Sequence, residues 1–248
     1  YMKENNVETV DEIRGLLVKN QEEIIMHYTG TIWRPPYEAY SLLVQVTAGC
    51  THHSCKFCTL YEDLPFKFKL SPFSEVKADL AEASKNYRKI PRIFFTGANP
   101  FVLSTEKLKT LAKMVKEYYP FYKTIGCFAR ITDIMPKSLE ELKELRALGY
   151  DGITIGVETG DDESLTFMNK GFQSKDVLEQ CRKLDEAGIS YNFFYLTGIY
   201  GAGRGEVGAK KTVMLFNQLN PKIIESSMLT IYKTSELYQE IQKGNWKE

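Results

Sequence analysis

Residues 49–58 read Gly49-Cys50-Thr51-His52-His53-Ser54-Cys55-Lys56-Phe57-Cys58 and follow the apolar run at 42–46. Three of the chain's five cysteines fall in this segment, with the spacing C-x4-C-x2-C. An odd total with such clustering does not suit a disulfide framework and is typical of a metal or cluster site. Three thiolates on one short loop can each bind one iron of a cubane cluster and leave the fourth iron open. We therefore predict that Cys50, Cys55 and Cys58 hold a [4Fe-4S] cluster.

Two other metal sites are consistent with the same cysteines. Structural zinc would take His52 or His53 as its fourth ligand, but zinc sites usually draw ligand pairs from two segments, and no second C-x2-C or H-x3-H pair follows. A ferredoxin-type electron carrier would need a fourth cysteine close by. The other two cysteines, Cys127 and Cys181, stand alone in apolar settings, so we expect them to be small buried hydrophobes.

The composition limits the class of protein. At 248 residues and 43% apolar content, the chain is long enough for one sizeable core. Lysine plus arginine equals aspartate plus glutamate, 32 against 32, so no overall charge attracts nucleic acid or an anionic membrane surface. No apolar run approaches the roughly 18 residues that span a bilayer, and the start of the chain is rich in charge. We expect a cytoplasmic protein with no membrane contact, and a nucleic-acid partner is not indicated.

Apolar periodicity predicts that strands alternate with helices along the chain. The expected strands are 42–46, 92–96, 123–129, 153–157, 191–196 and 223–231. The expected helices between them are 74–88, 104–118, 138–149, 174–187 and 206–219. Ser138 with Glu141 predicts a capping box, and Gly188 predicts the end of a helix.

Strands that alternate with helices, with no hairpin turn signal between them, require a parallel sheet with right-handed crossovers. Either a barrel or a doubly wound sheet satisfies this alternation. A further helical pattern at 10–28 precedes the first strand, and Pro35-Pro36 interrupts the chain after it. We therefore divide the chain into an N-terminal helical extension, 1–36, and a strand-helix domain, 37–248.

Glycine or polar residues follow the strands, where β/α barrels carry their functional groups. Thr96-Gly97-Ala98-Asn99-Pro100 follows the second strand, Arg130 the third and Glu158 the fourth. A charged residue that closes an apolar strand faces solvent or a polar site, because an unpaired charge in the core is costly. Together with the cysteine loop, these positions predict a functional site at the carboxyl ends of the strands.

The segment after the fifth strand contains Gly203, Gly205 and Gly208, which satisfy the dinucleotide fingerprint G-x-G-x-x-G. That fingerprint belongs to the first βαβ unit of a doubly wound sheet, whereas here it would follow the fifth strand. A flexible loop over the site fits better. Within it, Arg204 is either a solvated side chain or a partner for a substrate carboxylate or phosphate. A nicotinamide-dependent oxidoreductase is the less favoured interpretation of these glycines.

The cysteine loop resembles that of the radical S-adenosylmethionine (SAM) superfamily, which follows the first barrel strand and carries an aromatic residue, here Phe57, before its last cysteine. The superfamily usually has three residues between the first two cysteines, whereas this chain has four. Residues 49–60 and 153–171 are most similar to the branch of oxygen-independent coproporphyrinogen oxidase and its uncharacterised Fe-S relatives. The resemblance covers roughly residues 40 to 240 and implies a partial (β/α)6 parallel barrel of radical SAM type.

The resemblance also implies a site for a [4Fe-4S] cluster and SAM. Gly97-Ala98-Asn99 resembles the glycine-rich segment whose backbone receives the SAM amino group, with Ala98 in place of the second glycine and Asn99 in place of the usual acidic residue. By the same resemblance, Glu158 would hydrogen-bond the SAM ribose and Lys170 would pair with the methionine carboxylate. The expected cofactor-binding set is completed by Phe57, Arg130 and Tyr232, the last at the edge of the adenine pocket.

The implied activity is that of a radical SAM enzyme, similar to Fe-S oxidoreductases. An electron donor such as flavodoxin or ferredoxin would reduce the cluster, and cleavage of SAM would give methionine and a 5'-deoxyadenosyl radical. That radical would remove a hydrogen atom from a small-molecule or otherwise unidentified substrate. The alternative is a non-catalytic Fe-S or zinc-binding sensor or carrier, which would bind metal without turning SAM over.

Overall fold

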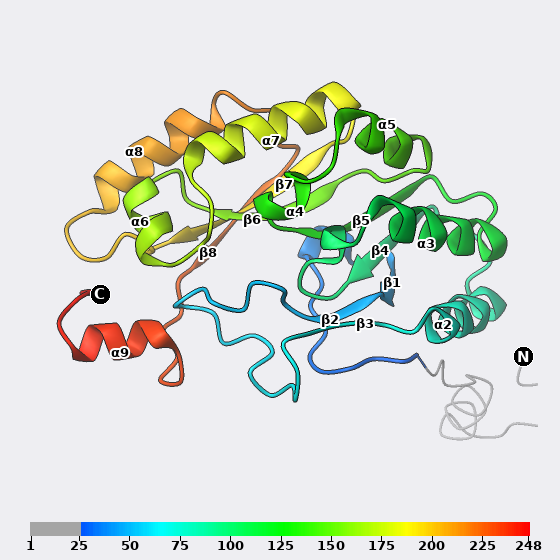
Figure 1. Cartoon of the computed structure of the whole chain (residues 1–248), viewed down its shortest axis with the longest axis horizontal. Helices are drawn as coiled ribbons and strands as arrows, with labels where there is room; N and C mark the ends of the chain where they lie inside the picture. Colours follow the sequence, from blue (N-terminus) through cyan, green and yellow to red (C-terminus); the bar gives the residue numbers. More distant parts are fainter. Residues whose placement is uncertain (1–25) are drawn as a thin grey trace, which may run out of the picture.

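The computed structural model describes residues 26–248, which are built around a parallel sheet of six strands (Figure 1). The strands are β1 (Leu42–Gln45), β4 (Arg92–Thr96), β5 (Thr124–Ala129), β6 (Ile153–Glu158), β7 (Tyr191–Thr197) and β8 (Ile224–Met228). They pair in the order β1-β4-β5-β6-β7-β8, and each pair is parallel. The predicted α/β class is confirmed.

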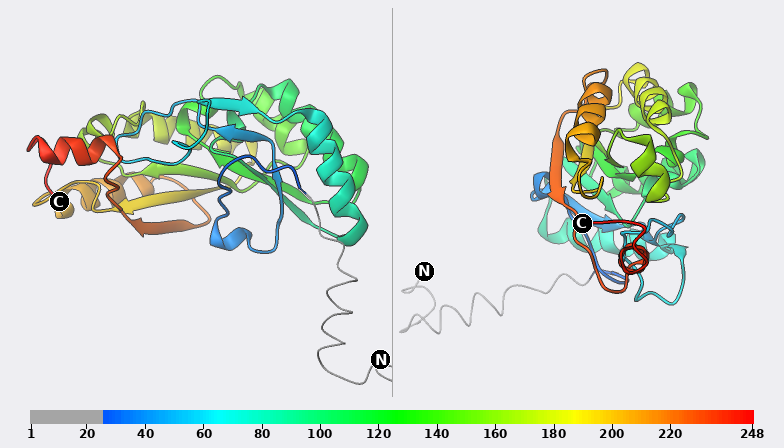
Figure 2. Two further views of the ribbon diagram at one scale, coloured as in Figure 1. Left: turned by 90° about the horizontal axis from the view of Figure 1, so that it is seen from below. Right: turned by 90° about the vertical axis from the view of Figure 1, so that its left-hand side faces the viewer.

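The order of the strands distinguishes the two architectures that the sequence allows. A doubly wound sheet reverses its strand order partway and binds ligands at the reversal. Here the spatial order follows the chain from β1 to β8 without a reversal. In the described part of the chain, β1 and β8 each pair with one neighbour in this sheet, so the sheet is a partial barrel that is open at one side (Figure 2).

The longer helices cover one face of this sheet, as both views in Figure 2 show. They are α2 (Phe73–Asn86), α3 (Thr105–Tyr118), α5 (Leu139–Ala147), α7 (Ser174–Ala187) and α8 (Gly205–Phe216). The strand side chains that face them are fully buried, among them Ile93, Ile125, Ile155 and Phe193. Cys127 and Cys181 belong to the same core, which confirms that they are buried hydrophobes.

Several short elements were not predicted. An antiparallel pair, β2 (Thr47–Gly49) with β3 (Phe68–Leu70), stands outside the main sheet. Strands of this length show too few alternating residues to be recognised in a sequence. The other short elements are η1 (Pro36–Glu38), η2 (Pro100–Val102), α4 (Ile131–Ile134), α6 (Asp162–Phe167) and α9 (Glu236–Gln242). The pair β2-β3 frames the cysteine loop, so the most important omission lies next to the site.

The predicted helix at 10–28 falls mostly outside the described residues. Residues 26–28, which are described, are not helical, so the helix does not extend to 28 as expected. Instead the chain runs beside β1, where Tyr28 Oη donates to the Leu43 carbonyl at 3.0 Å and the Thr29 N–H donates to Gln45 Oε1 at 2.6 Å. The division at residue 36 remains a prediction.

The amino ends of the strands are closed by a buried ion pair between η1 and β4. Arg92 Nε donates to both oxygens of Glu38, at 3.0 and 2.9 Å, and Glu38 is 1% exposed. Arg92 Nη1 donates to Thr124 Oγ1 at 3.0 Å and to the Asp151 carbonyl at 3.1 Å, and Nη2 donates to the Gly152 carbonyl at 3.2 Å. Because an unpaired buried charge is costly, this set of partners fixes the 36–38 segment against the sheet.

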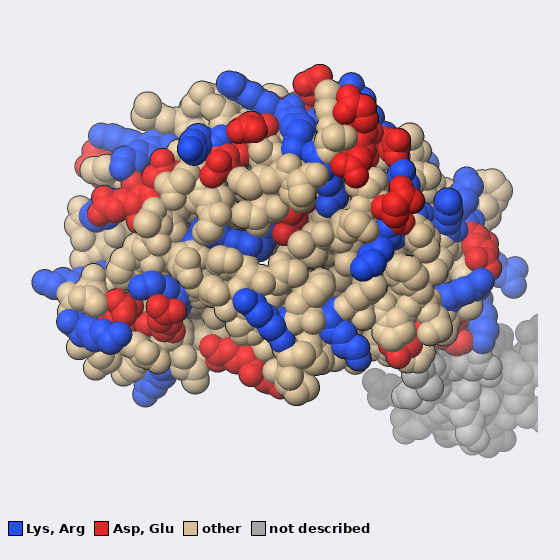
Figure 3. All heavy atoms as spheres, in the orientation of Figure 1, with Lys and Arg blue, Asp and Glu red and all other residues tan. Residues whose placement is uncertain are grey.

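Charges of both signs are interspersed over the face shown in Figure 3, with no large area of one sign. This distribution agrees with a formal net charge of zero. Among residues 26–248, the helices are all too short or too polar to cross a bilayer.

Candidate functional site

The cysteine loop starts where β2 ends, at a position that only glycine can occupy without strain. Gly49 has a φ of +75°, and a Cβ there would lie 2.3 Å from the Lys67 carbonyl oxygen. The next residue, Cys50, donates its N–H to the same carbonyl at 2.9 Å. The β2-β3 pair therefore fixes the direction in which the loop leaves the sheet.

The three thiols of the loop are free, partly exposed and close enough to influence one another. Burial raises the pKa of Cys55, and the nearby Lys170 and Arg130 charges oppose that rise. Burial raises the pKa of Cys58 to about 11, with a further contribution from Cys55 and Cys50. A metal that binds here must displace protons from thiols that hold them tightly, as metal binding to cysteine requires.

The arrangement of ligating side chains bears on the zinc alternative. Within residues 26–248, no group of three or more histidine, cysteine, aspartate or glutamate side chains is placed to hold a single metal ion. A structural zinc needs four ligands that meet at one ion. In a cubane cluster each cysteine binds a different iron, so the sulfurs stand further apart. The described residues therefore do not form the four-ligand set of a structural zinc site.

Neither histidine of the loop is placed as a fourth ligand. His52 Nε2 donates to the Asn169 carbonyl at 2.6 Å, and burial lowers the pKa of this imidazole. His53 is exposed and has a φ of +46°. His52 therefore helps to attach the loop to Asn169, and His53 faces solvent.

The loop is attached to the segment that follows α6 and to α9. Asn169 Nδ2 donates to the Ser54 carbonyl at 2.9 Å, and the Lys56 N–H donates to the Met168 carbonyl at 3.1 Å. On its other side, the Lys56 carbonyl accepts from the Leu237 N–H at 2.7 Å. Segments that are distant in the chain thus hold the cysteines at the carboxyl ends of the strands.

Glu158 and Lys170, two predicted cofactor residues, form a buried ion pair beside the loop. Their exposed fractions are 9% and 4%, and Lys170 Nζ lies 3.1 Å from Glu158 Oε1. Burial acts to lower the pKa of Lys170, but Glu158 and Cys55 more than offset it, so the net shift is upward. Lys170 Nζ also lies 5.7 Å from the ring centroid of Phe57 and 5.6 Å from that of Phe172. A lysine that would pass for a surface residue in the sequence is one of the best-buried charges of the site.

The backbone at Glu158 is unusual for a residue with a side chain. Its φ is +67°, in the left-handed region, and the register between β6 and β7 shifts between Gly156 and Glu158. A bulge of this kind re-aims a side chain at the end of a strand. Such conformations cost free energy and cluster at functional sites.

Arg130 and Asn99 belong to a second network, which joins the site to α4. Arg130 donates through Nη2 to the Lys170 carbonyl and through its N–H to Asp133 Oδ2, the latter at 2.7 Å. Asn99 Nδ2 donates to Thr51 Oγ1 at 2.8 Å and to both Asp133 oxygens at 3.1 Å. Burial raises the pKa of Asp133 to about 6. Sequence reasoning missed Asp133, whose carboxylate accepts from the backbone N–H of the residue at the start of α4, three positions earlier.

In the segment Gly97-Ala98-Asn99, packing of the chain itself requires a glycine at position 97. Gly97 has a φ of +123°, and a Cβ there would lie 2.2 Å from Thr47 Oγ1. The glycine is therefore required for close approach of the β4 end to β2. Ala98, the next residue, is partly exposed.

Tyr232, the last of the predicted cofactor residues, lies beyond the end of β8. It is 52% exposed, and its described hydrogen bonds are those that its carbonyl accepts from the backbone N–H and side chain of Ser235. Its role at an adenine pocket remains a prediction.

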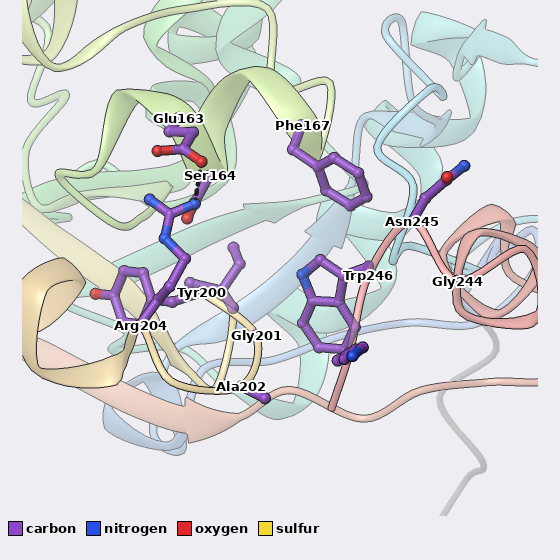
Figure 4. A pocket seen from close by; sticks show the side chains of 12 residues that line it. Glu163, Ser164, Phe167, Tyr200, Gly201, Ala202, Arg204, Gly244, Asn245 and Trp246 are labelled. Carbon is purple, nitrogen blue, oxygen red and sulfur yellow. Dashed lines mark hydrogen bonds and ion pairs between the residues drawn. The ribbon is translucent and has the colours of Figure 1, made fainter.

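Arg204 lies in a pocket of about 350 Å³ between α6, the β7-α8 loop and the segment after α9 (Figure 4). It donates to Asp161 Oδ2 at 3.0 Å and also to Glu163, so its charge is already paired. Phe167 and Trp246 project into the pocket from opposite sides. The sequence did not single out these two aromatic residues.

The glycines of the dinucleotide pattern have separate explanations. A Cβ on Gly208 would lie 2.0 Å from the Tyr200 ring, so this glycine packs α8 against the β7-α8 loop. A Cβ on Gly203 or Gly205 would meet nothing within 4 Å. The unreversed strand order also removes the place where a doubly wound sheet binds a dinucleotide.

The chain is similar to a known protein family and to individual known proteins. The model of the radical SAM superfamily matches residues 44–209. An uncharacterised protein of Methanocaldococcus jannaschii is 22% identical over 218 residues, which cover 84% of this chain and 66% of that protein. The heme chaperone HemW of Bacillus subtilis is 30% identical over 97 residues, 39% of this chain and 26% of HemW.

Solved structures share the fold. The radical SAM methyltransferase TsrM from Kitasatospora setae superposes with a TM-score of 0.66 and 17% identity over 90% of this chain and 45% of TsrM. Coproporphyrinogen III oxidase (HemN) from Escherichia coli gives a TM-score of 0.58 and 19% identity over 81% of this chain and 46% of HemN. The chain thus spans just under two thirds of the archaeal relative and less than half of each solved structure.

Proposed function

The chain belongs to the radical SAM superfamily, and from this membership we propose that it is an enzyme that binds a [4Fe-4S] cluster at Cys50, Cys55 and Cys58. Its reaction is the reductive cleavage of SAM, followed by removal of a hydrogen atom from a substrate. The observation that carries the proposal is the position of the three thiols on one clamped loop at the carboxyl ends of the strands, beside the buried pair Glu158–Lys170.

The bound cluster would supply one electron to SAM, which breaks into methionine and a 5'-deoxyadenosyl radical. The chain's own residues bind and orient the substrate of that step. Lys170 presents a buried positive charge beside Cys55, suited to the methionine carboxylate. Glu158 presents carboxylate oxygens, suited to the hydroxyl groups of the ribose. Because the two side chains pair with each other at 3.1 Å, both are pre-positioned for a ligand with one anionic and one hydroxyl group.

Protection of a reactive alkyl radical falls to the packing around the loop. A small apolar cluster joins α9 to the β7 end through Leu237, Met168 and Ile199, and Phe57 packs against it. This cluster excludes water from one side of the loop. The two spare cysteines lie in the helix-facing core, on the other side of the sheet from Phe94 and Phe128.

The proposal includes an electron donor such as flavodoxin or ferredoxin. The alternative that keeps the cluster but lacks turnover is an Fe-S sensor or carrier. The nicotinamide-dependent alternative is less favoured, because the strand order has no reversal.

The test is anaerobic reconstitution with iron and sulfide, followed by SAM and dithionite, with 5'-deoxyadenosine measured by chromatography. We expect about four irons per chain and formation of 5'-deoxyadenosine. Cys55→Ala should lose both, whereas the matched control Cys181→Ala, in the helix-facing core, should keep both. Iron without 5'-deoxyadenosine would support the sensor or carrier. Stoichiometric zinc with no iron or sulfide would refute the proposal.

A further inference from the structure

The face of the sheet opposite the helices carries a row of three phenylalanines, which we call the inner-face row: Phe94 on β4, Phe128 on β5 and Phe194 on β7. Their neighbours in each strand, such as Phe95 and Phe193, point to the helix-facing core. The ring centroids of Phe94 and Phe128 are 5.0 Å apart in an edge-on arrangement. Those of Phe128 and Phe194 are 6.3 Å apart with planes 27° from parallel. Phe94 is fully buried, whereas Phe128 and Phe194 are partly exposed, so these two rings are the ones that can receive another planar ring.

The inner-face row leads directly to the proposed cofactor residues. Gly156 lies on β6, between the strands that carry Phe128 and Phe194, and it contributes no side chain. A Cβ at Gly156 would lie 2.7 Å from Glu158 Oε1 and 3.8 Å from Lys170 Nζ. The Glu158 carboxylate therefore occupies the space over Gly156, which places the Glu158–Lys170 pair next to the strands that carry Phe128 and Phe194.

A carboxylate lies beside the row with part of its hydrogen-bonding capacity unused. Glu225 on β8 pairs in register with Phe194 on β7, so the two side chains share a face. The Glu225 charge contributes to raising the pKa of Tyr37. The Tyr37 hydroxyl forms a hydrogen bond with Thr154 Oγ1 at 2.9 Å, near the amino end of β6. Glu225 Oε2 is buried and has no hydrogen-bond partner among the described residues. A buried polar atom without a partner is costly, so such an atom points to a missing donor.

These observations identify the chemistry that the inner face recognises. We infer that the substrate is an arylalkylamine: its ring lies on Phe128 and Phe194, and its ammonium group donates to Glu225. This inference rests on the proposed function, because it places the substrate beside the pair that would hold SAM. A ligand with a carboxylate in place of the amine would meet the Glu225 charge and bind poorly.

The test uses equilibrium dialysis of the anaerobically reconstituted chain with 2-phenylethylamine as the probe and 3-phenylpropionate as its anionic counterpart. We expect the amine to bind at least tenfold more tightly than the carboxylate, because a hydrogen bond to a charged group contributes about 1.5–3 kcal/mol. Glu225→Gln should weaken amine binding about tenfold and narrow the gap between the two probes. Phe194→Leu should weaken both probes about threefold or more.

The matched control is Ser226→Ala, on the opposite face of the same strand, which should bind both probes as the unaltered chain does. Equal binding of amine and carboxylate, no binding of the amine, or binding unaffected by Glu225→Gln would each overturn the inference. Glutamine has nearly the same shape as glutamate, so Glu225→Gln is expected to fold. The binding measurement on this variant therefore still tests the inference if Phe194→Leu fails to fold.

A parallel assay measures formation of 5'-deoxyadenosine without any probe. It compares the unaltered chain with Cys55→Ala. If 5'-deoxyadenosine forms and the amine does not bind, the inference fails while the proposed function stands. If the amine binds through Glu225 and no 5'-deoxyadenosine forms, the proposed function fails instead.

Discussion

Each end of the sheet has an ion pair, and the two pairs differ in how many of their donors and acceptors are hydrogen-bonded by the protein. At the amino end, Arg92 holds both oxygens of Glu38 and also donates to a hydroxyl and two carbonyls. At the carboxyl end, Lys170 meets Glu158 through one oxygen at 3.1 Å. The first pair has nearly all its donors and acceptors occupied by protein, whereas the second keeps several available.

We interpret this difference as a separation of stability from the proposed function within one fold. A saturated network has nothing to offer a ligand and holds the chain together. An under-used pair, next to strained backbone at Glu158 and free thiols, is costly for folding and available for binding. If this contrast is correct, variants at the two ends should fail in different assays.

The largest effect is expected at the amino end, where Glu38→Ala leaves the partly buried Arg92 without its carboxylate. The free energy of unfolding should fall by about 3–5 kcal/mol, because removal of one partner of a buried pair exposes the full desolvation cost of the other. Urea unfolding monitored by circular dichroism measures this.

The double variant Glu38→Leu, Arg92→Met is the control for that measurement. It should recover most of the lost stability, because apolar side chains of similar volume often replace a buried pair at little cost. A loss below about 1 kcal/mol in Glu38→Ala would show that the amino end is not the stabilising end.

The second effect concerns the dependence of stability on pH at the carboxyl end. Burial raises the pKa of Asp133 from 3.8 to about 6, so the folded chain keeps a proton that the unfolded chain has lost. The stabilising contribution is full below pH 4 and is lost as pH rises through 6, a difference of about 3 kcal/mol at most.

The measurement is urea unfolding at several pH values between 4 and 7, for the unaltered chain and for Asp133→Asn. The difference between the two unfolding free energies should change across this range, because the asparagine does not titrate. Parallel curves would mean that Asp133 is not held in its neutral form by burial.

The third effect is on chemistry rather than stability. Lys170→Met should lower the rate of 5'-deoxyadenosine formation about a hundredfold, equivalent to about 2.7 kcal/mol, with iron content unchanged. Lys175→Met, at an exposed lysine of the next helix, is the control and should keep the full rate. Loss of iron in Lys170→Met would instead assign this lysine to support of the cysteine loop.

The parts of the fold that depend on local pattern were predictable from the sequence. The strand at 92–96 has the predicted bounds, the Ser138–Glu141 capping box forms through two hydrogen bonds, and Gly188 ends α7 with a φ of +73°. These features need only neighbouring residues, so propensity and periodicity are sufficient to find them.

The parts that depend on distant contacts were not predictable in the same way. The β2-β3 pair joins residues some twenty positions apart through three-residue strands. The ion pair Glu38–Arg92 has a separation of 54 residues, and the link from Asn99 to Asp133 one of 34. The cysteines were recognisable because their spacing is local, whereas the partners that hold them are assembled by the fold. The ligand roles of the cysteines and of Glu158, Lys170 and Tyr232 remain predictions.

Among the described residues, β1 and β8 do not pair with each other, so the sheet has two free edges. β8 borders solvent, and four of its five residues are exposed. Glu225 lies on this exposed edge strand, and Phe194 lies on the strand next to it. In the proposed function, the substrate would be bound close to this open edge, so one end of a long molecule could be bound while the remainder stays in water.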